Sequence, residues 1–476
     1  MLRNIFIIAY LTIVALLYLN YNAAPLLWLS FFLNTVILTF ITYYHIFLEK
    51  RYSPFLSTYI VFTFLFFTVA PILQSMHYME MENPLYDHKF PYKEDLFIKT
   101  NGLIALFQFV FFISYIALKT RLKTKSRVVQ NRVFHNKSIL IRNIVLLLVV
   151  SIIIIGIGFP FLIDAYVRHN WEVSSYSPGF QLIFNKTLFT VPIAAIVLAA
   201  HAMRGKVSTQ TWIVALVLGM AGIALCLLLK NPFTEKRNAL GPVYILILYL
   251  FMPRLFNSNV KTSFFMFFLM IVAFPVIQIL THLEWGIADI IDKPSRIFAF
   301  LEREDFSKGF LSLNYDAFAN IGIAIEEVTA NGFSYGYQFL SALLFFVPRT
   351  LWPGKPDSSG LILGNRLIDE YGFNFANISN PLVSEGYMNY GLFGVVLMAF
   401  LFAVTVVVFI KWLSSGDPLK RATAFYFAMH IIFLLRGDFT NGYSYFIGVL
   451  FGLFVIPKTL IKLSTFFLDT KIAVKS

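Results

Sequence analysis

Charged residues are scarce in this sequence. Only 13% of its 476 residues are Asp, Glu, Lys or Arg, whereas a soluble globular chain carries about 25%. Hydrophobic residues make up 58% of the chain. A soluble core could not absorb that much apolar surface, so the composition excludes an ordinary soluble protein and indicates a membrane protein.

Cysteine and the common nucleotide and metal motifs are also missing. The single cysteine, Cys226, lies in an apolar run, so an intramolecular disulfide is excluded and a reactive thiolate is disfavoured. The chain has no Walker A loop, glycine-rich dinucleotide turn, His-Glu-x-x-His or Cys/His cluster, and no Asp-x-Asp of the kind that holds a metal diphosphate. The sequence therefore predicts no cofactor and no metal site.

Long apolar runs fill most of the chain. Ile5 to Leu19, Leu26 to Leu48 and Trp212 to Leu229 each approach the ~20 apolar residues that cross a bilayer. The predicted spans are 4–20, 26–48, 55–76, 98–118, 140–163, 181–203, 210–229, 239–252, 262–281, 387–410, 422–435 and 442–457. The predicted fold class is an all-α polytopic membrane protein with about 12 transmembrane helices. The first run lacks a convincing cleavage site and is expected to be a retained helix.

The basic residues predict the orientation. With the amino terminus inside and alternating spans, 22 of the 38 Lys and Arg residues fall on the inner side, and segment 119–142 holds eight of them without any acid. This is the positive-inside pattern, so both termini are expected in the cytoplasm. The net charge of +13 is thereby explained without nucleic acid as a partner.

One outer connection is much longer than the others. Residues 282–386 form a large predicted periplasmic loop, between helices 1–9 in residues 1–281 and helices 10–12 with a cytoplasmic tail in residues 387–476. Short amphipathic helices are expected at the membrane interface over 297–306 and 315–329. Segment 338–347 is apolar but too short to span, so it is expected to be re-entrant. Such a loop is where a polytopic protein can build a site.

Cations at the outer membrane edge are the strongest candidates for chemistry. They break the orientation rule and lie in three separate turns. They are Lys236 and Arg237, then Arg349 and Lys355 around a proline-rich turn, then Arg436. Arginine suits bidentate binding of phosphate oxygens, so the three turns predict one cradle for an anion such as a lipid diphosphate. The alternative is that each cation pairs locally, with Glu235, Asp357 or Asp438, or reaches lipid headgroups.

Acidic and aromatic residues near the same edge are less decisive. Glu385, Asp316 or Asp438 could act as general base toward a sugar hydroxyl, or simply pair with a neighbouring arginine. His430 lies within the eleventh span, either at the substrate or as a buried, hydrogen-bonded neutral histidine. Tyr387 could stack on a sugar face or anchor the interface. Gly448-x-x-x-Gly452 predicts close helix packing.

The late region resembles a known family. The residues concerned are Phe346-Val347-Pro348-Arg349-x-x-Trp352-Pro353-x-Lys355-Pro356, segment 379–386 and Tyr390-Gly391-Leu392-x-Gly394. They look like the late region of Wzy-type polymerases, the O-antigen and oligosaccharide repeat-unit polymerases of bacterial inner membranes. The turn with Lys236 and Arg237 is similar to another basic turn of that family, and the topology matches along nearly the whole chain.

The resemblance implies a GT-C-like glycosyltransferase that needs no metal or nucleotide. It would join oligosaccharide units carried on undecaprenyl diphosphate at the periplasmic face, making O-antigen, enterobacterial common antigen or a similar polysaccharide. A chain-length-determining co-polymerase is a further expected partner, beside membrane lipid. Expected catalytic residues are Arg237, Arg349, Arg436, Glu385 and Asp316. Expected substrate-binding residues are Lys236, Lys355, Trp352, Asp438, His430 and Tyr387.

Two alternatives stay open. An O-antigen ligase catalyses a related transfer to lipid A-core, but ligases usually show a loop histidine, and this loop has only His282 at its start. A lipid-linked oligosaccharide flippase should show internal pseudo-symmetry and polar residues near mid-membrane. The charges here cluster at the outer edge instead, which favours the polymerase.

Overall fold

Helices account for the regular structure of the described residues, and no strand occurs among them. The structure is a computed structural model and describes residues 1–80, 93–121, 136–168, 178–205, 207–230, 237–273, 306–374 and 376–473. Within these ranges nine helices are long and apolar enough to cross a membrane, and two shorter apolar helices cover 240–251 and 259–273. The prediction of a polytopic helical membrane protein is therefore confirmed.

The predicted spans fall mainly on helices, with a non-helical break at Tyr390 and Gly391 inside span 387–410. Residues 274–281 lie outside the described ranges. The amino-terminal helices are α1 (Leu2–Asn20), α2 (Pro25–Tyr43), continued by the π-helix η1 (Tyr44–Leu48), α3 (Pro54–Phe64), continued by η2 (Leu65–Val69) and α4 (Ala70–Glu80), and α5 (Glu94–Arg121). The middle helices are α7 (Lys137–Arg168), α8 (Pro178–Lys186), η4 (Leu188–Thr190), α9 (Val191–Ala202), α10 (Thr209–Leu229), α11 (Arg237–Phe251), η5 (Pro253–Phe256), α12 (Asn259–Phe268) and η6 (Leu269–Ala273). The last ones are α20 (Leu382–Leu413), α21 (Pro418–Arg436), α22 (Phe439–Val449), η8 (Leu450–Val455) and α23 (Ile456–Ala473).

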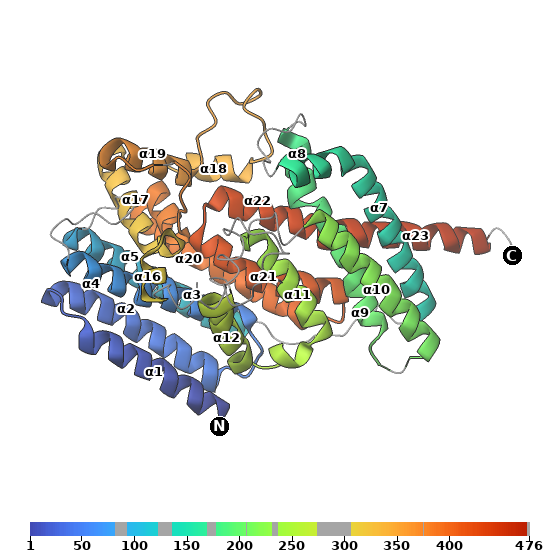
Figure 1. Cartoon of the computed structure of the whole chain (residues 1–476), viewed down its shortest axis with the longest axis horizontal. Helices are drawn as coiled ribbons and strands as arrows, with labels where there is room; N and C mark the ends of the chain where they lie inside the picture. The colour runs from blue at the N-terminus through green and yellow to red at the C-terminus, as the bar shows by residue number, and fades with distance from the viewer. Residues whose placement is uncertain are drawn as a thin grey trace, which may run out of the picture.

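Two helices form the interior of the bundle. The continuous segment 54–79 is 94% buried within its apolar window, and α21 packs against α3, α20, α11 and α9. Helix α21 carries Lys420, Arg421 and His430 and is not among the nine helices that are long and apolar enough to cross a membrane. By contrast, α1 and α10 lie at the edges of the bundle with large apolar side chains exposed (Figure 1). Such exposed apolar faces suit contact with lipid.

Hydrogen bonds between buried amides attach α2 to α5. Asn34 donates through Nδ2 to Asn101 Oδ1 at 2.6 Å, and Asn101 donates to Ser30 at 2.9 Å. Gln108 donates to Asn34 at 3.3 Å. The hydrophobic effect does not drive helices together in lipid, so polar contacts of this kind help, beside close packing, to hold α2 in place.

Hydrogen bonds and ion pairs connect helix ends to one another, and the connected ends form two groups. One group joins Lys119 to Glu49, Ser53 to Asn259, Lys137 to the carbonyls of Ala202 and Arg204, and Lys458 to Asp417. The other joins Gln74 to the carbonyl of Tyr315, Lys93 to Glu326, Lys186 to Asn441, and Arg436 to Asp316. The first group contains the ends that alternating spans place inside, and the second those placed outside. The contacts therefore agree with an alternating path of the chain.

The predicted outer loop contains more helix than expected. Its described elements are α16 (Phe306–Leu311), η7 (Leu313–Tyr315), α17 (Ala317–Asn331), α18 (Tyr337–Leu343) and α19 (Ser359–Tyr371). The helix predicted over 315–329 is confirmed as α17, which is mostly buried against α5 and α20. Its position at the membrane interface stays a prediction. Helix α19 was not predicted, and α20 begins at Leu382 rather than at 387.

Two other loop predictions are only partly covered. The predicted helix 297–306 lies outside the described residues except for its last position. Segment 338–347 is helical to Leu343 and then turns, with α18 packed against α22. Its re-entry into the membrane stays a prediction. The proline-rich turn that follows α18 projects from the upper side of the molecule in Figure 1.

The Gly448-x-x-x-Gly452 prediction of close packing is confirmed. A Cβ at Gly448 would lie 2.2 Å from the carbonyl oxygen of Lys186, and one at Gly452 would lie 2.1 Å from that of Thr187. We expect Gly448→Ala or Gly452→Ala to lower the free energy of unfolding by about 1–3 kcal/mol through overpacking. Thermal unfolding of the detergent-purified protein measures this. The matched control is Gly102→Ala in α5, where a Cβ has nothing within 4 Å; equal melting of all three variants would contradict the prediction.

Candidate functional site at the outer ends of the helices

An ion pair joins the end of α21 to the start of α17. Arg436 donates through Nη2 and Nε to Asp316 Oδ1 at 3.0 and 3.3 Å, and through Nη2 to the carbonyl of Leu313 at 2.8 Å. Asp316 precedes the first turn of α17, where a carboxylate is favoured by the helix dipole. The Arg436 side chain is 34% exposed and that of Asp316 only 6%. The Arg436 side chain is therefore partly accessible while it is paired with Asp316.

The same carboxylate extends into a chain of hydrogen bonds. Ser379 donates to Asp316 Oδ1 at 2.9 Å, and Asn320 donates through Nδ2 to Ser379 at 2.8 Å. The Oδ1 atom of Asn320 is buried and has no hydrogen-bond partner in the part of the chain that the structure describes. A buried acceptor of this kind is costly unless it is met by a donor. Asn320 therefore contributes a buried acceptor beside this carboxylate.

Two helix amino termini meet at two further carboxylates. Glu385 accepts hydrogen bonds from the Ser359 hydroxyl at the start of α19 and from the amide of Phe439 at the start of α22, the latter at 2.9 Å. Asp438 accepts from the amide of Gly360 at 3.2 Å and from that of Asn441 at 3.1 Å. Carboxylates at these positions satisfy amides that have no partner inside the helix. The pairs fix α19 against α20 and α22.

Gly360 is required for this arrangement. A Cβ at Gly360 would lie 2.3 Å from the carbonyl oxygen of Ile378 and 3.4 Å from Oδ2 of Asp438. A larger residue would therefore push α19 away from Asp438. The absence of a side chain lets the backbone amide reach the carboxylate.

We call this set the outer polar cluster: Asp316, Ser359, Ser379, Glu385, Arg436 and Asp438. It joins the outer loop to the ends of α20, α21 and α22, and it unites four predicted site residues, Arg436, Asp316, Glu385 and Asp438. Glu385 is only 2% exposed. The cluster combines buried carboxylates, which can accept protons, with an accessible cation that can bind an anion.

The proline-rich turn is not part of this cluster through any described contact. Arg349 donates to Asp357 Oδ1 at 2.5 Å and to the carbonyl of Lys355 at 2.6 Å. Lys355 donates to the carbonyls of Leu344, Phe345 and Val347, each at 3.0 Å. Burial, and then the charge of Arg349, lower the pKa of Lys355. Trp352 donates to the Tyr337 hydroxyl at 3.1 Å.

The predicted cradle of cations needs correction. Arg349 pairs locally with Asp357, which is the alternative that the sequence left open, because the prolines fold the turn back on itself. The local alternative for Arg436 is wrong, since this residue pairs with Asp316 rather than with Asp438. Each of these two guanidinium groups is thus occupied by a carboxylate of the chain. The side chains of Lys236 and Arg237 lie outside the described residues.

The remaining predicted residues have packing contacts. His430 is buried, and its Nε2 lies 3.2 Å from the carbonyl oxygen of Gly442, so the interpretation as a buried, hydrogen-bonded histidine is confirmed. Tyr387 lies edge-on to Phe333, with 6.0 Å between ring centroids. Neither contact places a substrate.

Lys186 is an outer cation that the sequence analysis missed. It ends α8, and its Nζ donates to Ser444 at 2.5 Å and to Asn441 at 3.2 Å, both on α22. The Nζ atom also lies 4.9 Å from the ring centroid of Tyr445. A lysine at the outer end of predicted span 181–203 breaks the orientation rule, and this signal could have identified it.

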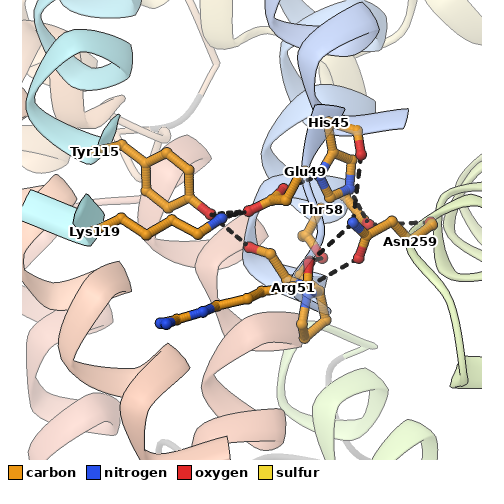
Figure 2. A network of polar contacts seen from close by, with 10 residues as sticks. His45, Glu49, Arg51, Thr58, Tyr115, Lys119 and Asn259 are labelled. Atoms are coloured by element: carbon orange, nitrogen blue, oxygen red, sulfur yellow. Dashed lines mark hydrogen bonds and ion pairs between the residues drawn. The ribbon is translucent and has the colours of Figure 1, made fainter. Parts of the chain in front are cut away.

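A second cluster lies at the opposite ends of the helices. Figure 2 shows Glu49 meeting His45 of η1 on one side and Tyr115 and Lys119 of α5 on the other. The other ring nitrogen of His45 lies 2.8 Å from the Ser57 hydroxyl. The side chains of Glu49 and His45 are fully buried, and that of Lys119 is 11% exposed.

Asn259 attaches α12 to this region. Its Nδ2 donates to the carbonyls of His45 and Arg51 at 3.3 and 3.2 Å, and its Oδ1 accepts from the amide of Ser53 at 2.9 Å. Figure 2 shows Asn259 reaching the connection between η1 and α3. We call His45, Glu49, Ser53, Ser57, Tyr115, Lys119 and Asn259 the inner polar cluster. It joins four helices around one buried carboxylate.

The sequence held a signal for this cluster that was not used. Glu49 is one of only three acids on the predicted inner side. An acid where nearly all charges are basic implies a specific partner. Asp417, another of the three, also has one, since it accepts from Lys458 at 2.8 Å.

No protein-family model, curated protein or solved structure matches this chain. Its class follows from the fold alone, which is that of a multi-pass helical membrane protein. Within the described ranges no three His, Cys, Asp or Glu side chains are grouped to hold a metal ion.

Proposed function

We propose that this chain is a membrane glycosyltransferase that polymerises oligosaccharide repeat units carried on undecaprenyl diphosphate. In this proposal twelve helices cross the bacterial inner membrane in a GT-C-like arrangement, both termini are cytoplasmic, and the large loop is periplasmic. The observation that carries the proposal is the outer polar cluster, in which Arg436, Asp316, Glu385 and Asp438 adjoin one another where the loop meets α20–α22. The resemblance of segments 346–356, 379–386 and 390–394 to Wzy-type polymerases supports the same function.

The reaction requires an accepting base and a stabilised leaving group. The hydroxyl of the acceptor sugar attacks the anomeric carbon of the donor, the bond from that carbon to the diphosphate breaks, and a carboxylate takes the hydroxyl proton. Arg436, whose side chain is 34% exposed, would meet the diphosphate as negative charge develops on it. Asp316 is the carboxylate paired with it and is the candidate base.

Deletion of the gene tests the proposal in the bacterium that carries it. A gel of surface polysaccharide should then show loss of long chains, with single repeat units still attached to the core, and a plasmid copy should restore the ladder. Loss of every repeat unit from the core would instead identify a ligase or a flippase. An unchanged ladder would reject all three functions.

A further inference from the structure

We propose that Lys186, together with Asn441 and Ser444 of α22, forms a binding site for a phosphate group borne by a lipid. The Lys186 ammonium hydrogen-bonds the Ser444 hydroxyl and the Asn441 side-chain oxygen, so its position on α22 is defined. The contact between Gly448 and the Lys186 carbonyl holds the backbone of α8 against the same helix. The ammonium is therefore fixed rather than a freely moving surface group.

The described neighbours of Lys186 leave its charge uncompensated. Both hydrogen-bond partners are neutral, and no carboxylate of the described residues lies within ion-pair distance of it. Asp438 acts on Lys186 electrostatically, but its two oxygens accept from the amides of Gly360 and Asn441. Lys230, at the end of α10, carries a second positive charge, which repels the charge of Lys186. A partly buried ammonium in this setting is stabilised by an external anion.

The position of Lys186 indicates where that anion comes from. Lys186 lies at the outer end of an apolar helix, in the group of helix ends that contains the outer polar cluster. If this end of the helix lies at the membrane edge, as the spans predict, lipid phosphates are the anions nearest to it. Asn441 and Ser444 follow Asp438 on α22, so a phosphate at Lys186 would be close to the outer polar cluster. If the proposed function holds, this phosphate belongs to the undecaprenyl diphosphate of a substrate, and Lys186 takes the part first assigned to Arg349.

Binding measurements test the site without requiring activity. The full-length protein in nanodiscs of zwitterionic phosphatidylcholine would be titrated with undecaprenyl diphosphate, phosphatidylglycerol and inorganic pyrophosphate, and bound ligand measured by native mass spectrometry. We expect Lys186→Met to weaken binding of undecaprenyl diphosphate by about ten- to hundredfold, the usual effect of losing a charged hydrogen bond. Lys186→Arg should retain it. Lys99→Met is the matched control, because Lys99 also lies toward the outer end of its helix but is exposed.

Each outcome has a defined meaning. If binding of undecaprenyl diphosphate depends on Lys186, the phosphate at the site belongs to the substrate. If binding of phosphatidylglycerol depends on it, the phosphate belongs to a lipid headgroup. If only pyrophosphate binding depends on it, the site binds free phosphate, and the proposal that a lipid bears the phosphate is overturned. Binding of all three probes by Lys186→Met as by the wild type overturns the site. Lys186→Gln, which keeps polar contacts with Asn441 and Ser444, replaces Lys186→Met if the latter does not fold. Intact binding together with an unchanged polysaccharide ladder in the deletion strain would reject the polymerase and leave the site standing.

Discussion

Arg436→Ala is expected to lower polymerisation by about 10²- to 10³-fold. Within the proposed function, Arg436 meets the departing diphosphate, and deleting one preorganised donor at a developing charge costs about 2.7–4 kcal/mol of transition-state stabilisation. The side chain is held at this position by Asp316 and by the carbonyl of Leu313. The measurement is the length distribution of surface polysaccharide in a deletion strain that carries the variant gene.

The controls separate catalysis from stability. Arg436→Lys keeps a charge without the bidentate geometry and should retain part of the activity. Arg349→Ala should change the ladder little, because Arg349 is 57% exposed and paired with Asp357. Immunoblots of membrane fractions must show equal protein in all strains. If the Arg349→Ala strain is as defective as the Arg436→Ala strain, both arginines act at one anion site, as the sequence predicted. If the Arg436→Ala strain shows a normal ladder, Arg436 has no part in the mechanism.

The helices could be predicted because crossing a bilayer imposes a length and a composition. Predicted spans such as 26–48 and 210–229 agree with the observed helices within a residue or two. Helix α19 could not be predicted in this way. Gly360 and Gly364 weaken the helical pattern of its sequence, and they are present because a Cβ would lie 2.3 and 1.9 Å from the carbonyl oxygens of Ile378 and Ala376. Tertiary packing, not local helix propensity, therefore determines that this segment is helical.

The partners of the charged residues depend on contacts between distant parts of the chain. For Arg436 the sequence offers Asp438 two residues away, yet the ion pair forms with Asp316, 120 residues earlier. The oxygens of Asp438 instead accept hydrogen bonds from the first turns of α19 and α22. These contacts involve a helix that the sequence did not reveal. The residues of the site could be selected from the sequence, but their pairing could not.

Glu49→Gln is expected to destabilise the protein by about 3–5 kcal/mol. The change keeps the size of the side chain but removes the negative charge to which Lys119, Tyr115 and His45 are bound. Breaking a buried ion pair on one side leaves the other charge uncompensated, which is why the cost is large. Thermal or denaturant unfolding of the purified protein measures the effect. For comparison, Lys99→Met removes an exposed pair with Asp95, at 3.4 Å, and should change the stability by less than about 1 kcal/mol.

The double variant Glu49→Gln/Lys119→Met decides whether charge or shape explains the loss. Lys119→Met alone should also destabilise, since it leaves Glu49 buried with one cation fewer. If the ion pair is responsible, the double variant recovers part of the stability, because neither charge is then left alone. Additive losses would mean that the two side chains act independently. Melting of Glu49→Gln like the Lys99→Met control would show that the inner polar cluster does not hold α2, α3, α5 and α12 together.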